Sequence, residues 1–266
     1  MRIESKFSEL AHKNKAGLIT YITAGDPNLE VTMDIILELE NNGADIIELG
    51  IPFSDPMADG PAIQLASERS IKNGTTLSKV LETVKEIRKK TEIPIILFGY
   101  YNPFFVYGLG RFAQDAKTAG VDGILVVDLP PEESEEFRMQ LEQNNLELIF
   151  LLAPTSTSER IELVSKYGSG FIYLVSVTGV TGERPMLEYS LKPLITEIKS
   201  HSKLPVGIGF GVSSAEQACS ISKIADAVIV GSALVKIIEK NNNNKEILLN
   251  EMGSLVNNLS RACYRN

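Results

Sequence analysis

The segment Asp45-Ile-Ile-Glu-Leu-Gly-Ile-Pro-Phe-Ser-Asp-Pro-Met-Ala-Asp-Gly-Pro61 joins a short apolar run to a loop rich in glycine and proline. The run at 45–49 predicts a buried strand, and the prolines of the loop each fix their own φ, so the loop is shaped rather than floppy. Two carboxylates, Glu48 and Asp59, lie at either end of this loop. A carboxylate beside a buried strand is costly unless it has a partner or a task, so this connection predicts a catalytic site.

Similar apolar runs recur from one end of the chain to the other, with helical patterns between them. Most are nearly continuous, which is typical of parallel strands that are covered on both faces. The predicted strands are 17–23, 45–49, 94–99, 123–127, 146–151, 170–175, 205–208 and 226–230. Eight β/α units in about 250 residues predict an α/β fold of the (β/α)8 TIM barrel type. A doubly wound open sheet is the alternative.

The helical patterns add three elements to the eight units. A helix at 3–12 precedes the first strand and is expected to plug the bottom of the barrel. Short extra helices are predicted at 62–73, in the second βα connection, and at 233–240, after the eighth strand. Ser213-Ser-Ala-Glu216 has the pattern of a capping box that opens a helix. No break in composition marks a second domain, so 1–266 is expected to form one barrel domain, in which the asparagines at 241–244 make a turn between two helices.

The composition limits the classes of function. The 266 residues include 26 Lys and Arg against 34 Asp and Glu, a net charge of −8, which disfavours nucleic-acid binding. No apolar run approaches the roughly 20 residues that span a bilayer, and residues 1–10 lack the apolar core of a signal peptide. The two cysteines, Cys219 and Cys263, and the two histidines, His12 and His201, are scattered, which argues against a disulfide framework and a Cys or His metal site.

In a (β/α)8 barrel the active site lies at the carboxyl ends of the strands, and several glycines fall there. Loops after the sixth, seventh and eighth strands contain Gly182, Gly211 and the pair Gly231-Ser232. Their backbone N–H groups, with a helix amino terminus behind them, can surround a phosphate without any Lys or Arg. Each glycine alone would be consistent with an ordinary turn, but three such loops together favour a phosphate site.

Apolar and aromatic side chains are predicted at the same end of the barrel. They would fill the core or line a flat apolar pocket that suits an aromatic ligand. These residues are Tyr21, Phe98, Tyr100, Leu125, Leu151, Tyr173 and Phe210.

The acidic residues at this end differ in how strongly they indicate function. Glu48 is the strongest candidate because a glutamate on a buried strand must point into the barrel mouth or meet a buried cation. Asp59 is a stronger candidate than an isolated aspartate, because it lies in the same shaped loop as Glu48. Asp26 and Asp55 precede prolines and are more typical of turn or cap residues, and Asp128 fits a structural or a functional role equally well.

At these residues the chain resembles the tryptophan synthase alpha subunit family, and the resemblance covers essentially the whole chain. The most specific motif is the segment from Glu48 to Pro61 followed by Ile63-Gln64. The other motifs agree in order: Thr23-Ala-Gly-Asp-Pro27, Tyr100-Tyr-Asn-Pro103, Asp128-Leu-Pro130, Gly179-Val-Thr-Gly182, Gly209-Phe-Gly211 and Gly231-Ser232. The loop that continues with Glu183-Arg184-Pro185 varies within the family.

The resemblance implies retro-aldol cleavage of indole-3-glycerol phosphate to indole and glyceraldehyde 3-phosphate, within tryptophan biosynthesis. It implies that Glu48 protonates C3 of the indole and accepts the proton of the side-chain hydroxyl, and that Asp59 stabilises the positive charge on the indole nitrogen. It implies no metal and no organic cofactor on this chain. The implied indole contacts are Tyr21, Phe98, Tyr100, Leu125, Leu151 and Phe210, with Tyr173 beside Glu48; Gly182, Gly211, Gly231 and Ser232 would hold the phosphate.

The resemblance also implies a partner, a beta subunit that carries pyridoxal phosphate, in an alpha2beta2 tetramer. Asp55 and Pro56 would face this subunit, and Thr181 would close over the site and bond to Asp59. No nucleic acid or membrane partner is expected, and the expected location is the cytoplasm, or the plastid stroma for an organellar gene.

Three other functions are alternatives to this one. A phosphosugar isomerase would share the predicted phosphate loops, but the loop from Glu48 to Asp59 excludes it, because those enzymes would use a different arrangement of acid and base. A stand-alone indole-3-glycerol phosphate lyase would turn over without a partner. A non-catalytic subunit that only activates a beta chain would lack activity of its own.

Overall fold

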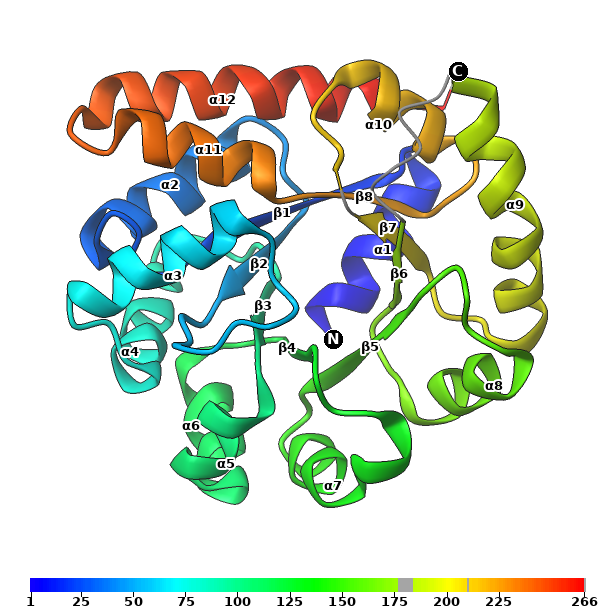
Figure 1. Ribbon diagram of the computed structural model, residues 1–266, viewed down its shortest axis with the longest axis horizontal. Coiled ribbons are helices and arrows are strands. Elements are labelled where there is room, and N and C mark those ends of the chain that lie inside the picture. Colours follow the sequence, from blue (N-terminus) through cyan, green and yellow to red (C-terminus); the bar gives the residue numbers. More distant parts are fainter. Residues whose placement is uncertain (177–183, 210, 266) are drawn as a thin grey trace.

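The protein forms a closed eight-stranded parallel barrel in a computed structural model that describes residues 1–176, 184–209 and 211–265 (Figure 1). Each strand pairs with its neighbours in sequence, and β8 pairs with β1. The strands are β1 Gly17–Thr23, β2 Ile46–Gly50, β3 Ile95–Gly99, β4 Gly123–Val126, β5 Glu147–Leu152, β6 Ile172–Val175, β7 Val206–Gly209 and β8 Ala227–Val230. The predicted (β/α)8 barrel is therefore confirmed.

All eight predicted strands are present, and their observed ends differ from the predicted ones by no more than two residues. Asp45 and Asp226 were predicted inside strands but precede them, because each carboxylate accepts a hydrogen bond from a backbone N–H of the preceding strand. The sixth strand begins later than predicted, since Gly170 has a φ of +73°, which is not a strand conformation.

Twelve helices surround the barrel in the described part of the chain. They are α1 Arg2–His12, α2 Leu29–Asn41, α3 Pro61–Lys72, α4 Leu77–Ile87, α5 Tyr101–Tyr107, α6 Leu109–Ala119, α7 Glu135–Gln143, α8 Ser158–Tyr167, α9 Arg184–His201, α10 Ala215–Ser222, α11 Ser232–Asn241 and α12 Lys245–Ala262, with a 3-10 turn at Pro131–Glu133. The predicted extra helices α1, α3 and α11 are confirmed. No helix in these ranges is both long and apolar enough to cross a membrane.

One helix start differs from the sequence prediction. The capping box of α10 begins at Ser214, whose hydroxyl accepts from the N–H of Gln217, so the predicted box at Ser213 and Glu216 is wrong by one residue. Either serine satisfies the local pattern, because Gln217 follows Ser214 at the same spacing as Glu216 follows Ser213. The segment after β3 begins α5, and the carboxylate of Asp128 accepts from the N–H of Tyr101, the first residue of this helix, at 2.7 Å.

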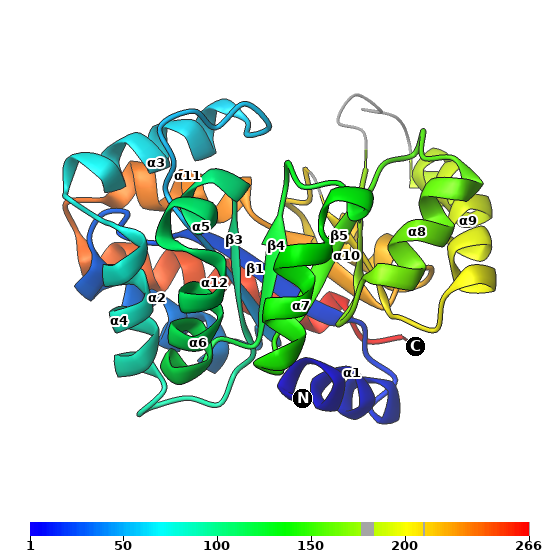
Figure 2. The ribbon, with the colours of Figure 1, turned by 90° about the horizontal axis from the view of Figure 1, so that it is seen from below.

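Helix α1 closes the bottom of the barrel (Figure 2). Its buried Ile3 and Phe7 pack with the inward-facing residues of the strands, and the rings of Phe7 and Phe171 lie 5.8 Å apart. The inward layer above them includes Ile19, Ile46, Ile96, Leu125 and Ile149. The loop between β2 and α3 lies at the opposite end of the barrel (Figure 2), so the end that α1 does not cover is the end where the sequence places the site.

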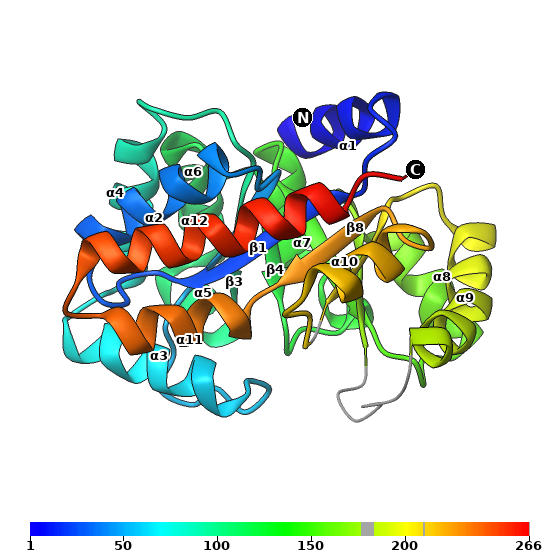
Figure 3. The ribbon, with the colours of Figure 1, turned by 90° about the horizontal axis from the view of Figure 1, so that it is seen from above.

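The carboxyl-terminal helix α12 packs across α2, α10 and α11 on the outside of the barrel (Figure 3). Its buried stripe includes Leu248, Met252, Val256 and Leu259. The predicted asparagine turn separates α11 from α12, and its last residue, Asn244, caps α12 by accepting from the N–H of Ile247.

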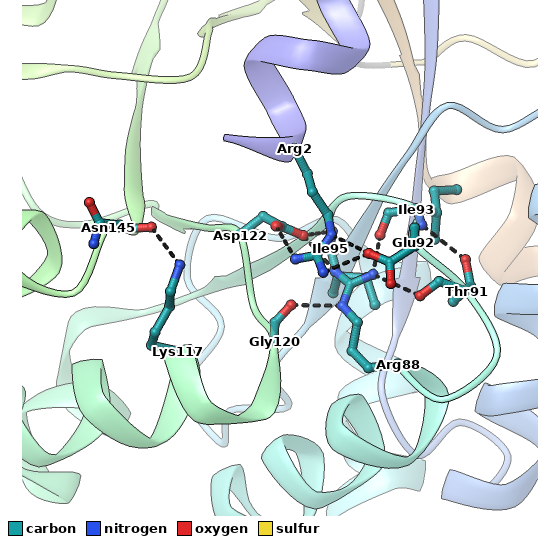
Figure 4. A network of polar contacts seen from close by, with 10 residues as sticks. All are labelled: Arg2, Arg88, Thr91, Glu92, Ile93, Ile95, Lys117, Gly120, Asp122 and Asn145. Carbon is teal, nitrogen blue, oxygen red and sulfur yellow. Dashed lines mark hydrogen bonds and ion pairs between the residues drawn. The ribbon is translucent and has the colours of Figure 1, made fainter.

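A polar network joins α1 to the bottom of the barrel (Figure 4). Asp122, just before β4, accepts from Arg88 at 2.5 Å, from Arg2 at 3.1 Å and from the backbone N–H of Ile95 at 2.9 Å. Arg88 also donates to the carbonyl oxygens of Gly120 and Ile93. These bonds tie α4, α6 and α1 to the start of two strands.

Candidate active site

Glu48 is the central residue of β2. It lies level with Tyr21 of β1 in the strand register and points into the barrel. The residue is 1% exposed, and neither carboxyl oxygen has a hydrogen-bond partner among the described residues. Burial raises the pKa of Glu48 to about 8, because the charged form loses its hydration. At neutral pH this carboxyl group is therefore mostly protonated and able to donate a proton.

Asp59 ends the loop that follows β2. The hydroxyl of Tyr100 donates to Asp59 Oδ2 at 3.1 Å and accepts from the N–H of Ala58 at 2.9 Å. Burial raises the pKa of Asp59 to about 6, and the hydrogen bond from Tyr100 opposes this shift. Asp59 is therefore mostly ionised at neutral pH, whereas Glu48 is not. The two carboxyl groups differ in protonation state because their surroundings differ.

Both acids open into a cavity of about 290 Å³ at the top of the barrel. The walls are predominantly apolar and include Ala58, Gly60, Ile63, Phe98, Val127, Leu151, Val175 and Ile229, with the rings of Tyr21 and Tyr173. The rings of Tyr21 and Phe98 meet edge to face with 5.2 Å between centroids. Such a cavity suits a flat apolar group with a few polar atoms.

Two glycines make room for the tyrosines of this pocket. A Cβ on Gly50 would lie 2.3 Å from the Tyr21 hydroxyl, and a Cβ on Gly209 would lie 2.2 Å from the Tyr173 hydroxyl. Each ring therefore leans over a glycine of the next strand, which leaves the centre of the barrel mouth open between them. Gly50 and Gly209 are required for this close approach and would not tolerate a larger residue without movement of the ring.

The glycine loops predicted to hold a phosphate also reach this cavity. Gly211, with a φ of +76°, Gly231 and Ser232 all line it. Gly231 is the N-cap of α11 and Ser232 is its first residue, so the free N–H groups of this helix start lie at the cavity wall. This arrangement can bind an anion with backbone donors and one hydroxyl.

The predicted site residues divide into three groups. The cavity brings together Glu48, Asp59, Tyr21, Phe98, Leu151, Tyr173, Gly211, Gly231 and Ser232. Tyr100 does not line the cavity but holds Asp59, and Leu125 is fully buried in the core. Thr181, Gly182 and Phe210 lie outside the described residues.

Sequence reasoning missed five apolar wall residues, Ala58, Ile63, Val127, Val175 and Ile229. Three of them follow the alternation of inward and outward residues, two positions after Leu125 and Tyr173 and two after Ala227. The alternation could therefore have predicted these three wall residues from the sequence. Ile63 has no such signal, because it belongs to α3 and reaches the cavity only through the docking of that helix.

The other acids of this end have structural partners. Asp26 is 1% exposed and accepts two hydrogen bonds from Arg69, while the N-cap of α2 is Asn28, so Asp26 is not the helix cap. Asp55 is exposed, with its neighbour Ser54 donating to it at 2.5 Å. Asp55 and Pro56 line a shallow outer groove with Phe53, Met57 and Ile71, in which the side chain of Met57 is 84% exposed.

Comparison with known proteins gives one consistent result. The family model described as "Tryptophan synthase alpha chain" matches residues 7–263. A tryptophan synthase alpha chain of Geotalea uraniireducens is 57% identical over 239 residues, which cover 90% of each chain. One from Geobacter sp. (strain M21) is 51% identical over 264 residues, 99% of this chain and 98% of the other. The crystal structure of tryptophan synthase subunit alpha from Legionella pneumophila superposes with a TM-score of 0.91 at 39% identity, covering 98% of both chains.

Proposed function

The chain belongs to the tryptophan synthase alpha chain family, and from this premise we propose that Glu48 and Asp59 are the catalytic pair of its active site. The protein is a carbon–carbon lyase that cleaves indole-3-glycerol phosphate to indole and glyceraldehyde 3-phosphate in tryptophan biosynthesis. One observation carries the proposal for the residues. Glu48 is a buried carboxyl group without a partner that opens into an apolar cavity next to a second carboxyl group.

The chemistry needs one group that first donates and then accepts a proton. Indole becomes a good leaving group when C3 is protonated, and the side-chain hydroxyl must lose its proton as the C–C bond breaks. Glu48, with a pKa raised by burial to about 8, begins as the acid. After it has protonated C3, the resulting carboxylate accepts the hydroxyl proton, and the carboxyl group returns to its starting state.

Asp59 stabilises the positive charge that protonation of C3 places on the indole nitrogen. Its partial burial strengthens this interaction, and Tyr100 holds one carboxylate oxygen while the other accepts no hydrogen bond from the described residues. The indole ring would lie between the walls formed by Tyr21, Phe98, Leu151 and Tyr173, with the phosphate at Gly211 and at the start of α11. The proposed steps use two carboxyl groups and assign no cofactor to this chain.

Alpha chains of this family act with a beta subunit. We place the docking surface on the outer face of the loop that ends at Asp59, where Asp55 and Pro56 lie, in an alpha2beta2 assembly with pyridoxal phosphate on the beta chain. Docking there would move the same loop that positions Asp59, and so couple assembly to catalysis. We further propose that 1–266 acts as one domain and works in the cytoplasm, in line with its bacterial relatives.

The experiment is indole release from indole-3-glycerol phosphate by the full chain, with and without a beta subunit. We expect a low rate alone and a higher rate with the partner. Asp59→Asn, which keeps the shape but not the charge, should lose most of the activity in both assays. A fast rate without the partner would identify a stand-alone lyase. An inactive wild-type chain would identify a subunit that only activates its partner. Full activity of Asp59→Asn would remove Asp59 from the mechanism.

A further inference from the structure

Helix α3 begins directly after the catalytic loop. Gly60 is its N-cap and Pro61 its first residue, and the side chain of Gln64 donates to the carbonyl oxygen of Asp59 at 2.8 Å. The backbone of Asp59 is therefore bonded to the first turn of α3. Since a helix is stiff over one or two turns, a tilt or shift of α3 would carry Asp59 with it.

Two turns further along, α3 is bound to the loop that follows β1. Arg69 donates from Nε to Asp26 Oδ1 at 2.9 Å and from Nη2 to Asp26 Oδ2 at 2.8 Å. The Asp26 side chain is fully buried and that of Arg69 is 24% exposed. A planar guanidinium that meets a buried carboxylate with two parallel bonds fixes both the distance and the orientation of the helix.

Two neutral contacts on the same face of α3 complete this connection. Ser70 donates to the carbonyl oxygen of Ala24, and Asn73, the C-cap of α3, donates to that of Pro27, both at 2.5 Å. Gly25 has a φ of +80°, and a Cβ there would lie 2.6 Å from the Ser70 hydroxyl, so the loop lies tightly against the helix. Arg69 also lies 3.6 Å from Glu239 of α11, beside which α3 runs in both views (Figures 1 and 3).

We propose that Arg69 and Asp26 form a positioning pair that sets the orientation of α3 and thereby holds Asp59 at the wall of the pocket. Arg69 lies about 12 Å along the helix axis from Pro61, so it acts through Asp59 and not on the substrate. Tyr100 holds the carboxylate side chain from one direction, and α3 holds its backbone from the other. The inference rests on the proposed role of Asp59.

The test compares Arg69→Lys with a matched pair at the other end of the barrel. Lysine keeps the charge but loses the two-bond fork, so we expect kcat for indole release, with the beta subunit present, to fall about 10- to 100-fold. We expect KM to stay within about threefold, because Arg69 is not among the described residues that line the cavity. Arg88→Lys breaks a comparably buried pair with Asp122 (Figure 4) and should lower the melting temperature while kcat stays within about twofold.

Further variants separate the possible outcomes. Glu239→Gln should leave kcat unchanged, because that contact is long and its carboxylate is 42% exposed. Asn73→Ala loosens the same connection without leaving a buried charge, so it should lower kcat about threefold even if Arg69→Lys does not fold. Equal kcat in the Arg69→Lys and Arg88→Lys proteins, or wild-type kcat in Asn73→Ala, would overturn the inference. Asp59→Asn is assayed in parallel: if it remains active the proposed function fails, whereas an inactive Asp59→Asn beside a fully active Arg69→Lys contradicts only the positioning pair.

Discussion

In the described part of the chain, two largely buried carboxylates at the closed end of the barrel have partners that Glu48 at the open end lacks, although Asp26, also at the open end, is paired with Arg69. At the end closed by α1, Asp122 accepts from two arginines and from a backbone N–H (Figure 4). Asp45 likewise accepts from Lys15 at 2.7 Å and from the N–H of Leu18 at 2.8 Å. At the open end Glu48 is at least as buried, yet neither of its oxygens has a partner among the described residues.

This difference separates stability from function. A paired buried carboxylate holds its strands in place, and removing its charge leaves a cation unpaired. An unpaired one lowers stability and persists where a reaction needs a proton at that position. The same pattern distinguishes two serines, since Ser169 accepts from the N–H of Leu148 at the closed end, whereas Ser232 faces the cavity.

The largest expected effect is the loss of turnover in Glu48→Gln. Glutamine keeps the shape but can neither deliver nor accept the proton, so the rate should fall roughly 10²- to 10⁴-fold. The fold should be retained, because the carboxyl group accepts no hydrogen bond from the described part of the chain that the substitution could remove. Indole release and thermal unfolding measure the two effects. A rate within about tenfold of wild type would mean that Glu48 is not the acid and base.

Asp122→Ala should have the opposite pattern. Its removal leaves Arg88 without its buried carboxylate, so we expect the free energy of unfolding to drop by about 3–5 kcal/mol. The kcat of the folded fraction should remain near wild type, because the network lies at the far end of the barrel. Urea unfolding and an assay at low temperature provide the measurement. A loss of kcat without a loss of stability would contradict the assignment of Asp122 to stability rather than to catalysis.

The buried Glu48 should also make stability depend on pH. Its ordinary pKa is 4.5, and burial raises the pKa to about 8 in the folded state. Between these values the folded protein keeps a proton that the unfolded chain has lost. The contribution of this proton to the free energy of unfolding is therefore complete below pH 4.5. It declines by about 1.4 kcal/mol per pH unit between the two pKa values and levels off above pH 8.

The measurement is urea unfolding across this pH range for wild type and Glu48→Gln. Subtracting the two curves removes every other titrating group, including Asp59, whose pKa is raised in the same direction. We expect wild type to lose stability relative to the variant as the pH rises. A difference that stays constant with pH would show that Glu48 is not buried in the protonated form.

The smallest expected effect compares the two serines. Ser232→Ala removes one hydroxyl from a phosphate site built mainly from backbone N–H groups, so KM should rise only about fivefold, equivalent to about 1 kcal/mol. Ser169→Ala removes the acceptor for a strand N–H and should lower stability by a similar amount without changing KM. If Ser232→Ala leaves KM unchanged, or Ser169→Ala raises it, the phosphate site is misplaced.

The sequence by itself determined the barrel and most of the cavity. Continuous apolar runs of four to seven residues located every strand within two residues, because burial on both faces leaves a local record in the chain. The motif from Glu48 to Pro61 identified both acids, and the order of the strands then placed the glycine loops at the same end.

Only the tertiary structure decided which side chains hold the site. Arg69 meets Asp26 across 43 residues, and the Tyr100 hydroxyl reaches Asp59 across 41. Nothing local to Arg69 distinguishes it from a surface residue of its helix, and the motifs that contain Tyr100 and Ile63 do not say which atoms these side chains contact. Their roles arise from the closure of the barrel and the docking of α3, since contacts between distant segments depend on the relative orientation of whole elements and leave no short-range pattern in the sequence.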